Sequence, residues 1–279
     1  MLNRSRIKKF LKKSLFSLYF FLAGGIPIPL PRRLSWGDWW LSWGDSLSRM
    51  VRDRSFEGME TEILRKLLKP GMVVMDAGAH RGYYTLLASK ILGAEGRVIS
   101  FEPSPRERRW LWLHMKVNGR RNIRIEKFAL GAKEETAEFF ISLDSQTGCN
   151  SMKFPKGVRY SLPICVPVIT LDAYCSRYGV SRLDFLKMDV EGAERDVLLG
   201  GSDFLRKMRP IIVCELSDIR TLRWKYRPIE TVKIIEGLGY ACYYINANSG
   251  LDPYREKPRY EENILAVPTE KISAVESIM

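Results

Sequence analysis

Short apolar runs alternate with amphipathic stretches through most of this chain. Runs at 72–75, 97–101, 122–128, 183–188 and 211–214 predict five buried strands. Between two of them, in 105–118, Trp110, Leu111, His114 and Val117 recur at helical spacing. Strands that alternate with helices predict an α/β fold with a mostly parallel sheet and helices on both faces.

Further elements flank this repeating pattern. Residues 57–69 predict an entry helix, with acids early and bases late, and Pro70-Gly71 then turns into the first strand. Residues 138–143 and 165–169 predict added strands, and the tail predicts an antiparallel pair at 240–245 and 263–267. The polar loop 144–157 is longer than a plain connection, which favours a function over a simple link between edge strands.

The turn after the first strand carries the strongest chemical signal. The apolar run ends in Asp76-Ala77-Gly78-Ala79-His80-Arg81-Gly82-Tyr83, and Glu102-Pro103 ends the next strand. A dinucleotide site uses G-x-G-x-x-G so that a helix N-terminus meets a pyrophosphate. Here the spacing is D-x-G-x-x-x-G, and Asp76 would repel a diphosphate but suit a cationic sulfonium amino acid. The pattern therefore favours S-adenosylmethionine over NAD, the alternative being a merely structural strand-to-helix turn.

Residues from about 57 to 270 resemble the FkbM family of S-adenosylmethionine-dependent methyltransferases. The resemblance rests on the Asp76–Tyr83 run, Phe101-Glu102-Pro103, Asn118, Ala129-Leu130-Gly131, Thr170-Leu171-Asp172 and above all Leu186–Glu194. His80 departs from the family, which more often has Asn there. The resemblance implies a Rossmann-like class I methyltransferase with a mostly parallel seven-stranded sheet, preceded here by an N-terminal helical extension.

Cofactor roles follow from this resemblance. It implies that the methionine part and the turn involve Asp76, Gly78, Ala79, His80, Gly82 and Tyr83. Glu102, beside Pro103, would bind the ribose, and Ala129 and Leu130 would flank the adenine. A family Ser on the cofactor side corresponds to Ser151.

Acidic residues follow the fourth and fifth strands, at the edge where open α/β sheets bind ligands. Asp189, Glu191 and Glu215 are the candidate bases or acceptor ligands, and Lys187 is expected either to pair with these acids or to extend outward from its strand. Glu194 has a simpler interpretation as a helix cap. Asp189 and Glu191 could also hold an oxygen-ligated Mg²⁺ or Ca²⁺, so the need for a metal stays open.

Charge is concentrated at the N-terminus. The formal net charge is +13, and residues 1–33 contribute eight basic side chains and no acid. This favours a basic N-terminal arm over a nucleic-acid-binding surface. The apolar stretch 15–26 is too short to span a bilayer. It suits a helix on an anionic membrane surface, a helix docked on the domain, or a signal sequence.

Residues 34–56 form a Trp-rich connecting cover between that segment and the domain 57–279. Leu34-Ser-Trp-Gly-Asp38 is repeated at Leu41-Ser-Trp-Gly-Asp45, and Trp36, Trp39, Trp40 and Trp43 fall close to one helical face. Three interpretations are open: core packing, an interfacial aromatic belt, or a stacking platform for a sugar or lipid head. The cover could equally form a homodimer interface.

The function expected is O-methylation of a hydroxyl or carboxyl on a sugar, glycan, lipid-linked saccharide or secondary metabolite. The alternatives are a membrane-tethered S-adenosylmethionine-binding partner without turnover and an NAD-dependent oxidoreductase. The chain has no G-x-S-x-G elbow, Walker lysine or C-x-x-C pair, and its five cysteines suit a reducing compartment. We therefore expect a cytoplasmic protein, peripheral on the membrane's cytoplasmic face if residues 1–33 anchor it.

Overall fold

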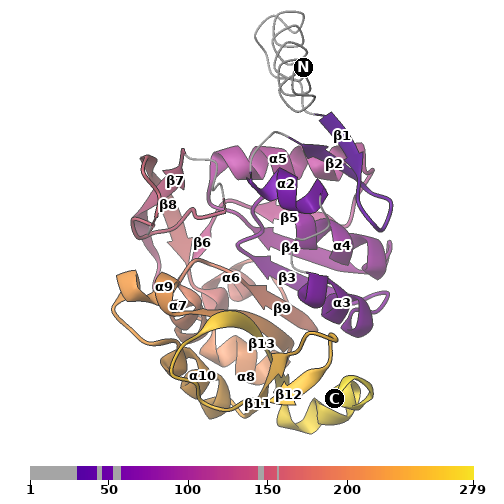
Figure 1. The fold of residues 1–279 in the computed structure, drawn as a ribbon, viewed down its shortest axis with the longest axis vertical. Helices are drawn as coiled ribbons and strands as arrows, with labels where there is room; N and C mark the ends of the chain where they lie inside the picture. Colours follow the sequence, from indigo (N-terminus) through magenta and orange to yellow (C-terminus); the bar gives the residue numbers. More distant parts are fainter. Residues whose placement is uncertain (1–29, 43–45, 53–57, 144–147, 156) are drawn as a thin grey trace, which may run out of the picture.

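The computed structural model describes residues 30–42, 46–52, 58–143, 148–155 and 157–279. Their largest element is a sheet with the strand order β12-β11-β13-β10-β9-β3-β4-β5 (Figure 1). Its parallel half contains β3 (Val73–Ala77), β4 (Arg97–Phe101), β5 (Ile123–Glu126), β9 (Phe185–Met188) and β10 (Ile211–Ser217). All five predicted strands are present, and β10 continues through Glu215 rather than ending before it.

The antiparallel half of the sheet differs from the prediction in strand number. β11 (Tyr240–Ile245) pairs with β13 (Glu261–Pro268), as predicted for the tail. A short strand, β12 (Leu251–Pro253), adds to the edge of β11, so the described sheet has eight strands rather than seven. The turn that returns the chain is closed by Asn246, whose side-chain oxygen accepts the amides of Asn248 and Gly250. β12 has only three paired residues, a run too short for the apolar pattern of the sequence to predict a strand.

Helices cover both faces of the sheet, and strand alternation divides the core between them. Met75, Met188 and Cys214 point to the face covered by α6, α7, α8 and α10, whereas Val74, Phe185 and Val213 point to the face covered by α3 and α4. The helices on the first face are α6 (Leu171–Arg177), α7 (Glu194–Leu199), α8 (Ser202–Met208) and α10 (Pro228–Gly237). Those on the second face are α3 (Gly58–Leu67), α4 (Tyr83–Leu92) and the C-terminal 3₁₀ turns η2 (Thr269–Ile278).

A smaller sheet stands beside the carboxyl ends of the parallel strands (Figure 1). It consists of β6 (Ala129–Leu130), β8 (Ser161–Ile169) and β7 (Glu135–Ser142), in that order. The two added strands predicted from the sequence are therefore present and longer than expected. The connection between them returns along β7, where Phe140 and Ser151 form a β-bridge.

Residues 30–42, which join the end of the basic segment 1–33 to the start of the Trp-rich cover 34–56, form a β-hairpin, so the helical interpretation of Trp36, Trp39 and Trp40 is wrong. β1 (Leu30–Arg33) pairs antiparallel with β2 (Trp39–Ser42), and α2 (Ser46–Arg52) follows. The turn needs Gly37, whose φ is +92°, a value that a helix excludes. Trp40 is fully buried beside Leu34 and Leu86, which fits the core-packing interpretation, while Trp43 lies outside the described residues.

The hairpin is fixed to α5 (Pro105–Val117) through His114. The ring of His114 stacks on Trp40 with centroids 4.1 Å apart, and its Nε2 accepts the Leu41 amide at 3.0 Å. Its Nδ1 lies 2.7 Å from the Arg81 carbonyl, which it contacts as the donor. Burial lowers the pKa of His114 to about 4, so the ring is neutral at physiological pH.

Most of the predicted membrane segment lies outside the described residues, which include only positions 30–33 of it. In the described ranges, no helix combines the length and apolar character needed to cross a bilayer. Surface attachment through residues 1–33 stays a prediction.

Candidate active site

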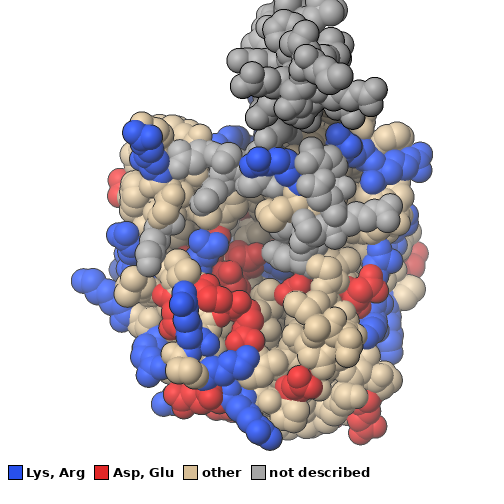
Figure 2. Space-filling view, viewed as in Figure 1, with Lys and Arg blue, Asp and Glu red and all other residues tan. Residues whose placement is uncertain are grey.

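A cavity with about 550 Å³ of empty space lies at the carboxyl ends of β3, β4 and β9. Parallel strands present ligands at this edge. Figure 2 shows acidic side chains gathered near the middle of one face of the molecule, with Lys and Arg side chains beside them. The predicted site residues that line the cavity are Gly78, His80, Glu102, Pro103, Ala129, Leu130, Asp189 and Glu191.

Gly78 brings the β3 turn against the loop after β9. Its φ is +81°, and a Cβ built there would lie 1.8 Å from the backbone oxygen of Asp189. The residue must therefore be glycine for the two loops to meet at the cavity. His80, also in this turn, has a positive φ of 49° and donates its amide to Glu102 Oε2 at 2.7 Å.

Asp76 lies beneath the cavity and does not line it. Its Oδ2 accepts the hydroxyl of Thr85 at 2.6 Å, and Thr85 Oγ1 also lies 2.8 Å from Ser100 Oγ. Oδ1 is buried and has no hydrogen-bond partner among the described residues. Burial raises the pKa of Asp76 against the lowering effect of Lys187. Asp76 is therefore a buried carboxyl with one acceptor oxygen unused, and its contact with the cofactor stays a prediction.

Three other turn residues also lie off the cavity wall. A Cβ on Gly82 would lie 2.2 Å from Leu111 Cδ1, so this glycine allows α4 to pack against α5. The Ala79 amide donates to the Phe101 carbonyl at 3.0 Å, which joins the turn to β4. Tyr83 points to the N-terminal hairpin, with its ring centroid 5.0 Å from that of Trp36 and 6.2 Å from that of Trp40.

Glu102 is held at the cavity by backbone donors. Besides the His80 amide on Oε2, its Oε1 accepts the Ser104 amide at 2.8 Å, and the side chain is buried. Burial and the nearby Glu107 raise the pKa of Glu102 to about 8. Each carboxyl oxygen keeps a lone pair for a further donor, as two adjacent ligand hydroxyls would supply.

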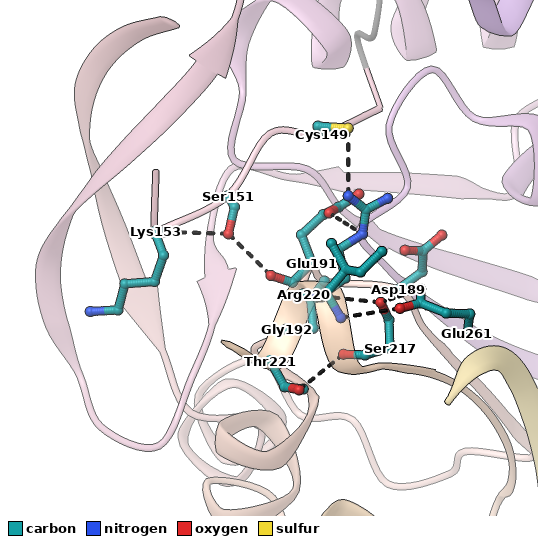
Figure 3. A network of polar contacts seen from close by, with 12 residues as sticks. Cys149, Ser151, Lys153, Asp189, Glu191, Gly192, Ser217, Arg220, Thr221 and Glu261 are labelled. Atoms are coloured by element: carbon teal, nitrogen blue, oxygen red, sulfur yellow. Dashed lines mark hydrogen bonds and ion pairs between the residues drawn. The ribbon is translucent and has the colours of Figure 1, made fainter. Parts of the chain in front are cut away.

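The rest of the cavity wall is largely apolar. Phe101, Phe128, Ala129, Leu130, Phe139 and Met152 supply it. Ser151 lies behind this wall, where its hydroxyl donates to the Glu191 carbonyl at 3.2 Å and accepts the Lys153 amide at 3.3 Å (Figure 3). Its neighbours Asn150 and Met152 line the cavity instead.

Lys187 and Asp189 form an ion pair at the end of β9. Lys187 is buried, and its Nζ lies 3.1 Å from Asp189 Oδ2 and 4.6 Å from the centre of the Tyr84 ring. Burial alone would raise the pKa of Asp189, but the charge and hydrogen bond of Lys187, together with the charge of Arg220, outweigh it, and the pKa lies below its ordinary value. Of the two interpretations of Lys187, the structure supports pairing with the acids.

Arg220 forms a second pair with Glu191, as Figure 3 shows. Arg220 belongs to α9 (Asp218–Thr221), and its Nε lies 2.8 Å from Glu191 Oε2. Glu191 adopts a left-handed backbone with φ of 57°. Burial and the neighbouring Glu215 raise its pKa well above the ordinary value, against the effect of Arg220. Glu215 also has a strongly raised pKa, from burial and Asp189, and its Oε2 is buried without a hydrogen-bond partner in the described part of the chain.

Glu194 is the first residue of α7, and its side chain binds amides of the loop before the helix. Its Oε1 accepts the amides of Val190 at 2.9 Å and Gly192 at 3.3 Å, which fixes the loop carrying Asp189 and Glu191. A role as helix cap stays a prediction. Over the described ranges, no three His, Cys, Asp or Glu side chains converge as a metal site would require. Asp189 and Glu191 are instead paired with Lys187 and Arg220.

Several site residues were not found from the sequence. Arg220 lies five positions after Glu215 on a short helix, and no motif marks it. Phe139, Asn150 and Met152 reach the cavity because the β7–β8 connection folds back over it. This folding back depends on pairing between Phe140 and Ser151, which the spacing of residue types along the chain does not predict.

The mostly parallel sheet with helices on both faces, and a cavity at its carboxyl edge, define the Rossmann-like fold of class I methyltransferases. The model of the methyltransferase FkbM domain matches residues 76–242, more than half of the chain. The chain therefore belongs to the FkbM family of methyltransferases.

Beyond the family model, the chain is also similar to individual proteins. The chain is 30% identical over 167 residues to the 2-O-methyltransferase NoeI of Sinorhizobium fredii, an alignment that covers 56% of this chain and 68% of NoeI. It is 28% identical over 191 residues to the AMB antimetabolite synthetase AmbE of Pseudomonas aeruginosa, covering 55% of this chain but only 9% of AmbE. The crystal structure of a methyltransferase FkbM from Methylobacillus flagellatus superposes with a TM-score of 0.44 at 13% identity, over 79% of this chain and 53% of that one.

Proposed function

We propose that this protein transfers a methyl group from S-adenosylmethionine to a hydroxyl of a saccharide-type acceptor. The carrying observation is that Glu102 and Asp189 line the same cavity and that Asp189 is paired with the buried Lys187. Glu102 offers a carboxyl to the two hydroxyls of a ribose. Asp189 offers an ionised carboxylate that can accept the proton of an acceptor hydroxyl. Membership of a methyltransferase family argues against the NAD-dependent alternative.

The cavity fits the cofactor chemically. Glu102 has an unused lone pair on each oxygen, and Phe101, Phe128 and Leu130 supply an apolar wall for a flat base. Gly78 keeps the turn open where a Cβ would collide, and the acidic rim suits the cationic end. When bound, S-adenosylmethionine supplies a methyl group already activated by its sulfonium.

The protein's remaining tasks are orientation and proton transfer. An acceptor hydroxyl must lose its proton as the new bond forms, which calls for a base within hydrogen-bond reach. Asp189 is suited to this role because Lys187 keeps it ionised, and the pair occupies Oδ2 while leaving Oδ1 as an acceptor. Arg220 pairs with Glu191, and Glu194 binds the loop that carries Asp189 and Glu191 and so positions both acids.

A hydroxyl acceptor is supported by the relative NoeI, which is a 2-O-methyltransferase. Within hydroxyl acceptors, we propose sugars, glycans, lipid-linked saccharides or sugar-like secondary metabolites. Attachment of residues 1–33 to an anionic membrane surface would favour a lipid-linked member of this group.

The test uses S-adenosylmethionine with a labelled methyl group and a panel of saccharides. We expect label that survives alkali, since methyl ethers do and methyl esters do not. Asp189→Asn should lower kcat by about 10²–10⁴-fold with little change in cofactor affinity, whereas Asp203→Asn, on the exposed surface of α8, should leave both unchanged. Full turnover by Asp189→Asn, or label lost in alkali, would contradict the proposal.

A further inference from the structure

Two hollows continue outward from the cofactor cavity and share its walls. The smaller, with about 250 Å³ of empty space, shares Glu191 with the cavity. The larger, with about 1010 Å³, shares Met152 with the cavity. Lys153, Phe154 and Trp224 line both hollows. The two hollows therefore adjoin the cavity at Glu191 and at Met152.

Trp224 is the fixed surface between the two hollows. It ends the 3₁₀ turn η1 (Leu222–Trp224), and its Nε1 donates to the Glu191 carbonyl at 3.1 Å. A Cβ on Gly192 would lie 2.5 Å from its Cδ1, so the indole edge packs directly against that glycine. The ring is thus held by the same loop that carries the acids, while it remains half-exposed.

Phe154 adds a second aromatic surface. It is 42% exposed, and its ring meets Phe140 edge to face with centroids 5.6 Å apart. An exposed phenylalanine beside a half-exposed tryptophan is costly in water and typical of a ligand site. Flat apolar faces of this kind are suited to the C–H faces of sugar rings.

The residues that line the two hollows include four basic and four acidic side chains, and the positive excess lies in the smaller hollow. Arg220 pairs with Glu191 in the smaller hollow. In the larger one Lys133 pairs with Glu135, and Asp196 lies beside Arg195, which also pairs with Glu230 outside the hollow. Lys153 and Arg223 remain without a carboxylate partner in the described part of the chain, and Glu138 lines only the larger hollow. Lys153 Nζ lies 5.3 Å from the Trp224 ring, and the side chain extends away from the Glu191–Arg220 pair (Figure 3).

We propose that these two hollows are the acceptor site and that the acceptor is an acidic saccharide. A sugar ring lies against Trp224 and Phe154, and a carboxylate or phosphate on the chain contacts Lys153 and Arg223. The proposal rests on the proposed methyl transfer to a hydroxyl and adds the class of acceptor. The acidic group lies on the outer side of Trp224, away from Asp189.

Binding of defined probes tests the proposal without knowledge of the natural acceptor. Full-length protein saturated with S-adenosylhomocysteine is titrated with tetragalacturonate, maltotetraose 6-phosphate and neutral maltotetraose. We expect at least one acidic probe to bind about tenfold more tightly than the neutral one. The double variant Lys153→Gln/Arg223→Gln should reduce acidic-probe binding to the neutral level.

Tryptophan variants separate stacking from fold effects. Trp224→Ala should weaken binding of the acidic probe by about tenfold or more. Trp224→Phe keeps an aromatic ring and should keep most of the affinity. Trp112→Ala is the matched control, because Trp112 is also exposed and has Lys116 Nζ 5.5 Å from its ring. The proposal is overturned if no acidic probe binds better than the neutral one, or if Trp224→Ala and Trp112→Ala bind alike. Calorimetry of S-adenosylhomocysteine on the same samples reports separately on the proposed function.

Discussion

Lys187 and Asp189 lie two residues apart around the end of β9, and the buried ammonium approaches the carboxylate to 3.1 Å. Asp76, which is paired in register with Lys187 on the neighbouring strand, faces the same side of the sheet. One buried cation thus acts on two carboxyl groups, and a nearby opposite charge strongly influences their protonation.

Removing this cation should raise the pKa of Asp189. In Lys187→Met we expect the pKa of Asp189 to rise by about 1–3 units. Carbon-13 NMR of the carboxyl groups measures this pKa, and the Asp189→Asn variant assigns the signal. Because a carboxylate acts as a base only when ionised, the acidic limb of the transfer rate should move to higher pH by the same amount. Lys187→Arg keeps the charge and should move it little. An unchanged Asp189 titration in Lys187→Met would show that the ion pair is not what holds this pKa down.

His114 should make the protein less stable in mild acid. Its pKa is about 4 in the fold against 6.5 ordinarily. The unfolded chain therefore takes up a proton that the folded ring refuses, and stability falls as pH drops from about 6.5 toward 4. Between pH 7 and pH 5 this costs about 2 kcal/mol. Urea unfolding at pH 7 and pH 5 measures this loss, and His114→Gln should lose about 2 kcal/mol less than the wild type. If the variant loses as much stability as the wild type, His114 is not the group responsible.

Two glycines with nearly the same backbone provide a matched test of the turn at the cavity. Gly71 has a φ of +78° and open space around a built Cβ, whereas Gly78 has a φ of +81° and a Cβ 1.8 Å from Asp189 O. Gly71→Ala should cost about 1–2 kcal/mol of unfolding free energy from backbone strain alone. Gly78→Ala should cost clearly more and abolish S-adenosylhomocysteine binding. Equal unfolding free energies would mean that the two loops can separate without penalty.

Much of the fold follows from the apolar pattern, because buried parallel strands are continuous apolar runs. The observed β4, at Arg97–Phe101, has the predicted bounds. The tryptophan segment misled because its spacing of three and four residues satisfies a helix, while Gly37 and the turn from Leu34 to Asp38 close a hairpin. Only contact with α5, through His114 and Asn118, decides between the two.

The sequence predicted several individual residues of the site but not all of the ion pairs that they form. Glycine, acid and strand-end positions identified Glu102 and Asp189 as neighbours of one cavity, since parallel strands end at the same edge. Which carboxyl lines the cavity depends on side-chain alternation and burial, and Asp76, which accepts the Thr85 hydroxyl, is not among the lining residues. The partner of Glu191 comes from a helix 29 residues later, a distance over which sequence spacing carries no information.

Cofactor binding should be linked to the proton on Glu102. Its pKa is about 8 in the free protein. Ribose hydroxyls that donate to the carboxylate favour the ionised form, so binding at neutral pH should release a proton. Calorimetry in two buffers of different ionisation enthalpy measures that release. It should disappear in Glu102→Gln; a release of the same size in that variant would place the proton elsewhere.

The most direct test of the account is titration of S-adenosylmethionine and S-adenosylhomocysteine into the wild type and Glu102→Ala, with Glu95→Ala as an exposed-acid control. The account predicts binding at about micromolar Kd in the wild type and the control, and its loss in a folded Glu102→Ala protein. Unchanged affinity in Glu102→Ala, or no binding by the folded wild type, would contradict the assignment of this cavity to the cofactor.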